Sequence, residues 1–195
     1  MDIQPVILTG RIVRLEPLSE KHIPDLTVAG QDESIWQYML YGVISTKEEM
    51  RDWVRDILNR QARDTDLPFA VIHLESGHAI GGTRFMDIRP QHRGVEIGGT
   101  WYATAYQRTA VNTECKYLLL CHAFEVWQCI RVQFKADLRN ERSQRALERI
   151  GAMREGVLRN HMILLDGTIR HSVYYSILDS EWPIVKRGLQ EKLGY

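Results

Sequence analysis

The sequence has few of the features that mark disulfide-stapled, metal-binding or nucleic-acid-binding proteins. Its three cysteines, at positions 115, 121 and 129, are odd in number and lack metal-ligand spacing, which argues against a disulfide scaffold and a metal site. Lys and Arg total 25, and so do Asp and Glu, so the positive excess typical of nucleic-acid-binding proteins is missing. We therefore expect no metal and no nucleic-acid partner.

Long hydrophobic runs are missing as well. No segment approaches the roughly 20 apolar residues that a membrane helix needs. The first residues, MDIQPVILTGRIVRLEPL, lack the basic stretch and apolar run of a secretory signal. These absences predict a cytoplasmic protein with no membrane partner.

What remains is the composition of an ordinary globular domain. The 195 residues are 44% hydrophobic and 26% charged, without repeats or linkers, which indicates one α/β (α+β) domain over residues 1–195. Strands are expected at 12–16, 69–74, 79–87, 95–102, 132–138, 162–165 and 169–177. Helices are expected at 19–30, 46–63, 113–127, 143–150 and 180–193. This order predicts a mixed sheet covered by helices.

Two of these elements carry more specific expectations. In the strand 95–102, Val95, Ile97 and Trp101 are expected on one face. The last helix has an apolar stripe of Trp182, Val185, Leu189 and Leu193, which must be covered. It either folds back on its own domain or packs against a second copy in a homodimer.

The segment from Thr100 to Glu125 joins a strand, a loop and a long helix. The free N–H groups at such a helix start, with the helix dipole, form an anion site that suits a pyrophosphate. Every strand–loop–helix unit has such groups, so this signal by itself is weak and the local sequence favours a plain connection.

A second informative segment follows the next strand, where Asn140 and Ser143 precede a short helix. Both residue types are good N-caps, so local physics favours a capping role. The string NERSQRALERIGA nevertheless resembles the Asn-x-x-Ser…Gly-Ala signature of the GNAT superfamily, in its RimJ/RimL branch of ribosomal-protein N-terminal acetyltransferases. The resemblance covers about residues 9–178.

The pyrophosphate loop of that family is matched at Gln107, whereas Ala110 and Asn112 replace its small residues. The resemblance implies a GNAT fold, in which two parallel strands, 95–102 and 132–138, diverge around acetyl-CoA. It implies cofactor contacts from the strand end, the loop and the second segment, at Trp101, Tyr102, Gln107, Arg108, Thr109, Ala110, Val111, Asn112, Thr113, Asn140 and Ser143.

The resemblance also implies direct acetyl transfer to an amine. Glu96 is a candidate general base, because an ammonium must lose a proton before it attacks a thioester; an ion pair with a nearby Lys or Arg is the alternative. Ser143 would assist the leaving thiolate, and Asn140 would hold the pantetheine arm. Trp36, Tyr38 and Tyr41 either line the acceptor site or pack in the core.

The acceptor amine is not readable from the sequence. A protein N-terminus fits the RimJ/RimL branch, and a small-molecule amine such as an amino acid, polyamine or antibiotic fits the superfamily. A non-catalytic CoA-binding or sensing module is the alternative outside enzymes, suggested by the altered QRTAVN loop.

Overall fold

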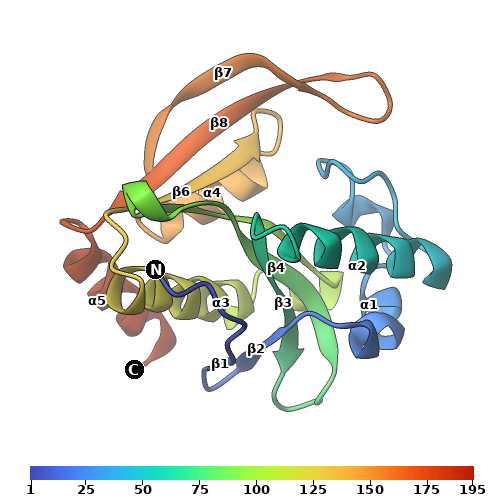
Figure 1. Cartoon of the computed structure of the whole chain (residues 1–195), viewed down its shortest axis with the longest axis horizontal. Helices are drawn as coiled ribbons and strands as arrows, with labels where there is room; N and C mark the ends of the chain where they lie inside the picture. Colours follow the sequence, from blue (N-terminus) through green and yellow to red (C-terminus); the bar gives the residue numbers. More distant parts are fainter.

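The structure, a computed structural model of residues 1–195, is built on one eight-stranded sheet with helices on both faces (Figure 1). The strand order is β1-β2-β3-β4-β5-β6-β8-β7. The strands are β1 (Leu8–Thr9), β2 (Val13–Pro17), β3 (Asp66–His73), β4 (Ala79–Arg89), β5 (Gly94–Tyr102), β6 (Arg131–Asp137), β7 (Met153–Ile163) and β8 (Ile169–Leu178). The helices are α1 (Ile23–Ala29), α2 (Lys47–Gln61), α3 (Ala110–Cys121), α4 (Glu141–Arg149) and α5 (Trp182–Leu193). The predicted fold class is confirmed.

Two hydrophobic cores lie on opposite faces of the sheet. The larger joins the sheet to α3, α4 and α5, and the smaller joins it to α1 and α2. Figure 1 shows α1 and α2 on one side of β3 and β4, with α3 and α5 on the other. Apolar residues at helical spacing on α2, such as Met50, Trp53 and Ile57, supply the smaller core.

The strands β5 and β6 form the one parallel pair of the sheet, and they separate after three residues. Their register ends at Glu96 opposite Gln133, although β5 continues to Tyr102 and β6 to Asp137. The space between the unpaired parts of these two strands is called the β5–β6 gap below. The predicted pair of diverging parallel strands is therefore present.

A bulge in β5 overturns the prediction that Val95, Ile97 and Trp101 share a face. Between Gly82 and Arg84 on β4, the partner on β5 shifts from Trp101 to Gly98, so β5 carries one extra residue. Gly99, with φ +57°, lies in this bulge. The extra residue reverses the alternation, and Trp101 therefore packs in the smaller core while Val95 and Ile97 pack in the larger.

Several element boundaries differ from the predicted ones. The helix α3 begins at Ala110 rather than Thr113, because Thr109 is its N-cap, and α4 begins at Glu141 because Asn140 caps it. The strand β7 begins at Met153, nine residues before the predicted start at Met162. It is an edge strand with mostly exposed side chains, so its sequence lacks the apolar alternation that marks a half-buried strand.

The last helix folds back onto its own domain. The indole of Trp182 stacks on Phe124 with ring centroids 5.2 Å apart, and its Nε1 donates to Glu125. Leu189 is buried, and the hydroxyl of Tyr195 donates to Glu114 on α3.

No helix of the chain is long and apolar enough to span a membrane.

Candidate active site

The outer end of the β5–β6 gap meets the start of α3. The hydroxyl of Thr109 accepts from the N–H of Val111 at 3.3 Å, and the side chains of residues 108–110 are exposed there. Val111 and Thr113 are buried, so only their backbone groups can face a ligand here. The first-turn N–H groups and the helix dipole make this end attractive to an anion.

Hydrogen bonds tie this helix start to the neighbouring elements. The Gln107 amide donates to the carbonyl of Tyr102 at 3.1 Å and accepts from Arg142 at 2.6 Å. The hydroxyl of Tyr102 donates to Asn112 Oδ1 at 3.3 Å. Asn112 therefore uses its side-chain oxygen to anchor the start of α3 to β5. Gln107 links the loop before this helix to α4.

Positive side chains gather at this end of α3. Arg108 is exposed and holds a left-handed backbone with φ +61°, while Arg142 and Arg149 reach across from α4. Arg149 donates to Thr113 Oγ1 at 3.0 Å. Neither Arg142 nor Arg149 was predicted as a site residue from the sequence, since only the docking of α4 beside α3 brings them here. A cluster of basic residues in one segment was the available signal.

Asn140 and Ser143 act as the capping pair of α4. The Asn140 Oδ1 atom accepts from the backbone N–H of Ser143 at 3.0 Å, so the capping role favoured by local physics is present. The amide nitrogen of Asn140 and the hydroxyl of Ser143 take no part in this cap. Both residues follow β6 and lie at the outer end of the β5–β6 gap.

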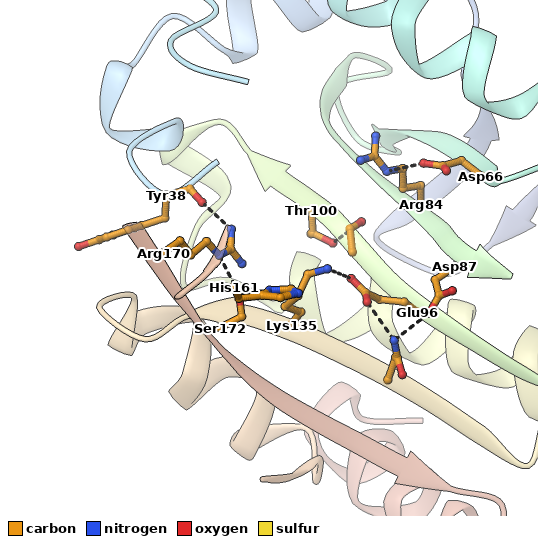
Figure 2. Close-up of polar contacts among 12 residues, drawn as sticks. Tyr38, Asp66, Arg84, Asp87, Glu96, Thr100, Lys135, His161, Arg170 and Ser172 are labelled. Carbon is orange, nitrogen blue, oxygen red and sulfur yellow. Dashed lines mark hydrogen bonds and ion pairs between the residues drawn. The ribbon is translucent and has the colours of Figure 1, made fainter. Parts of the chain in front are cut away.

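Glu96 lies at the closed end of the β5–β6 gap, on the face opposite α3. Its side chain is buried, with 3% of the residue exposed. Gln133 Nε2 donates to one carboxylate oxygen at 3.1 Å, and Lys135 Nζ lies 3.4 Å from the other (Figure 2). The ion pair expected as an alternative to catalysis is therefore formed, and it places a carboxylate where β5 and β6 separate.

Further polar side chains surround Glu96 and Lys135 on this face. His161 Nδ1 lies 2.9 Å from Ser172 Oγ, and Arg170 Nε donates to the same oxygen at 3.1 Å (Figure 2). Burial, together with the charges of Lys135 and Arg170, lowers the pKa of His161, so its ring is neutral at neutral pH. Burial also lowers the pKa of the Arg170 guanidinium.

The three aromatic residues predicted at the acceptor site divide into two groups. Trp36 is 2% exposed and packs on Trp101 with ring centroids 4.8 Å apart, so it is a core residue that faces no open surface. Tyr38 and Tyr41 are half-buried. The carbonyl of Tyr38 accepts from Arg170 at 3.3 Å, and the hydroxyl of Tyr41 accepts from Arg84.

The β5–β6 gap thus opens beside the start of α3 and has a buried carboxylate at its closed end. Residues 13–153 match the acetyltransferase (GNAT) domain family. The chain belongs to this family. It is thus a GNAT N-acetyltransferase, an enzyme of a family that uses acetyl-CoA.

Individual relatives agree with this assignment. The chain is 28% identical over 169 residues to "Putative ribosomal N-acetyltransferase YdaF" of Bacillus subtilis (strain 168), covering 86% of this chain and 90% of YdaF. A GCN5-related N-acetyltransferase structure from Brucella melitensis is 32% identical, with a TM-score of 0.91 and coverage of 96% and 85%.

Mycobacterium smegmatis RimJ, whose structure holds CoA-disulfide, shares the fold. The two chains are 18% identical, with a TM-score of 0.82 and coverage of 98% of this chain and 96% of that one. The YdaF relative, named a ribosomal N-acetyltransferase, agrees with the resemblance to the RimJ/RimL branch. No group of three or more His, Cys, Asp and Glu side chains is arranged to hold a metal ion.

Proposed function

We propose that this GNAT enzyme transfers the acetyl group of acetyl-CoA to the α-amine of a protein N-terminus. The observation that carries the proposal is the β5–β6 gap, which has an anion-attracting helix start at its outer end and the Glu96 carboxylate at its closed end. A protein acceptor is supported by the relative named a ribosomal N-acetyltransferase.

The pyrophosphate of CoA would bind at the start of α3. Backbone N–H groups of residues 109–113 would donate to it, and Arg108 and Arg142 would add positive charge. The pantetheine arm would pair with the free edge of β5 at Trp101 and Tyr102, as an added strand does. Asn140 and Ser143 would contact this arm from α4 with the polar groups that the helix cap leaves free.

Acetyl transfer itself would be direct. Glu96 would accept a proton from the acceptor ammonium, whose neutral nitrogen then attacks the thioester carbon. A backbone N–H of the bulged part of β5 would bind the developing oxyanion, and the C–S bond would break to release the thiolate. Lys135 balances the charge of Glu96 in the free enzyme.

An acceptor screen tests the proposal. Peptides with free N-termini, the same peptides with blocked N-termini, and small amines would be supplied with acetyl-CoA, and the released thiol measured. Transfer to the free peptides alone is the expected result. Transfer only to small amines would overturn the acceptor assignment, whereas CoA binding by calorimetry without any transfer would leave a CoA-binding module.

The role of Glu96 has a separate test. Glu96→Gln keeps the shape and removes the proton acceptor, so kcat should fall by roughly 100-fold or more. The loss should be largest at low pH, where the amine is protonated and needs the base. Asp87→Asn is the matched control, because Asp87 is exposed and shares the Gln133 partner at 3.1 Å. An equal loss at every pH would indicate a structural role for Glu96 instead.

The homodimer stays a prediction. The stripe on α5 is covered in part by α3 of the same chain, which removes the original reason for a partner. Ile184 on the outer side of this helix is exposed. Light scattering of the full chain, with Ile184→Asp as the variant, would show whether two copies meet there.

A further inference from the structure

A lysine on α3 is buried in the β5–β6 gap. Lys116 is 5% exposed, and its Nζ donates to Thr100 Oγ1 on β5 at 2.7 Å. The same Nζ lies 5.9 Å from the ring centroid of Phe134 on β6. Its ammonium group therefore lies between the two diverging strands, on the face that packs against α3.

Along the gap, Lys116 Nζ lies level with the part of β5 that follows its bulge, four residues beyond Glu96. Pairing between β5 and β6 stops at Glu96 and Gln133, and Phe134 is the next residue of β6. Thr100 follows the bulge of β5. An extended arm that enters from the start of α3 and pairs with β5 at Trp101 and Tyr102 reaches Thr100 next, so its terminal thioester would lie beside Lys116 Nζ.

Lys116 has no negative partner. The titratable group beside it is Cys115 on α3, and burial raises the pKa of that thiol to about 12, so it is neutral. The carboxylate of Glu114, two residues earlier on α3, accepts from backbone N–H groups of β2 and of the β1–β2 turn instead. From β6, Lys135 points to the other face, toward Glu96.

Burial without a carboxylate lowers the pKa of Lys116 to about 8, so the ammonium loses its proton more readily than a surface lysine. A buried charge that is neither paired nor needed for packing is costly to keep. Such groups concentrate at sites where a proton is transferred. The one hydrogen bond of Lys116 is to the hydroxyl of Thr100, which Thr83 also contacts at 2.8 Å.

We propose that Lys116 is the general acid that protonates the departing thiolate of CoA, an inference that rests on the proposed acetyl transfer. As the C–S bond breaks, its electron pair stays on sulfur. One Nζ–H bond of Lys116 breaks and an S–H bond forms, which leaves a neutral amine. The proton is restored from solvent after the products leave.

The two proton transfers then take place on opposite faces of the sheet. Glu96 and Lys135 lie on one face, where the acceptor amine loses its proton, and Lys116 lies on the α3 face, where sulfur gains one. The thioester in the gap separates them, so the base and the acid do not neutralise each other. Ser143 lies at the outer end of the gap, farther from where the strands pair.

The first test needs no acceptor amine. The ultraviolet absorbance of the thiolate follows the ionisation of CoA bound to the wild type and to Lys116→Met. Protein thiols do not interfere at moderate pH, because burial raises the pKa of Cys121 and Cys129 to about 11. The thiol bound to the wild type should ionise at least one pH unit lower than in the variant. Equal ionisation would overturn the proposal.

The second test uses the rate of transfer. Lys116→Met should lower kcat by roughly 100-fold or more while the Kd of CoA changes less than threefold. The wild-type rate should fall above about pH 8, and the variant should lack this alkaline decrease. Lys192→Met, an exposed lysine on α5, is the matched control and should behave as the wild type.

Other outcomes are distinguishable. A weaker Kd with kcat intact would make Lys116 a cofactor-binding residue and overturn the acid role. A lower melting temperature with an equal loss of rate at every pH would make it structural, and would also overturn it. A wild type that binds CoA but acetylates no amine would contradict the proposed function, whereas the thiol titration would still decide the contact with sulfur.

Discussion

Two buried cations, Arg84 and Lys116, lie beside β5 on opposite faces of the sheet, and only Arg84 has a carboxylate partner. Arg84 lies 2.9 Å from Asp66, donates to Tyr41 and packs beside the bulge at Gly99. Lys116 has one hydroxyl partner and no carboxylate. The ion pair of Arg84 stabilises the fold, whereas the unpaired Lys116 loses its proton more readily than an ordinary lysine.

The largest effect should come from breaking the paired cation. Asp66→Asn leaves the Arg84 guanidinium buried without its counter-charge, which should lower the free energy of unfolding by about 3–5 kcal/mol. Urea unfolding at neutral pH measures it. Asp56→Asn, which breaks an exposed pair with Arg60 on α2, should cost less than about 0.5 kcal/mol. Similar costs for both variants would remove the distinction between a paired framework and a surface ion pair.

Removing the unpaired cation should change the free energy of unfolding in the opposite direction. The pKa of Lys116 falls from 10.5 to about 8 in the fold, so its ammonium destabilises the native state by about 3 kcal/mol below pH 8. Lys116→Met should therefore raise the free energy of unfolding at pH 7 even as it lowers activity.

The pH dependence of the free energy of unfolding tests the same pKa shift of Lys116. Between pH 8 and 10.5 the unfolded chain holds more protons at this residue than the folded chain does, so the Lys116 contribution to stability rises with pH there. The buried thiol of Cys115 acts in the opposite direction, since its pKa is raised. The difference in unfolding free energy between wild type and Lys116→Met isolates the lysine, and should shrink from pH 8 to pH 10.5. A constant difference would contradict the pKa shift.

The smallest effects concern the outer end of the gap. Changing both Asn140 and Ser143 to Ala should lower transfer at least tenfold and, through the lost cap, cost about 1 kcal/mol. Asn140→Asp separates these effects, because Asp caps as well as Asn but lacks the amide donor. If Asn140→Asp keeps full activity, Asn140 is a cap alone.

The sequence was most informative where a local pattern has a local cause. The capping box of Thr46 and Glu49 predicted the start of α2, and both of its hydrogen bonds are present. The turn at Asp166 and Gly167 predicted the last hairpin. In the second segment, Asn140 and Ser143 were recognised both as caps and as part of the family signature.

The sequence was least informative where distant segments meet. The bulge at Gly99 moved Trp101 to the other face, because alternation predicts facing only in a regular strand. The aromatic run around Trp36 did not reveal which ring would fill the core. Nothing near Lys116 in the sequence distinguishes it from a surface lysine.

The sequence by itself determined the fold class, the family and the two segments proposed to border the cosubstrate, since these depend on hydrophobic periodicity, capping residues and a short motif. Only the tertiary structure decided which charges are paired. Asp66 and Arg84 meet because β3 and β4 are neighbours, and Lys116 lacks a carboxylate because α3 docks it into the β5–β6 gap. Coulombic and solvation energies depend on distance and burial in space, and neither is encoded at a single position along the chain.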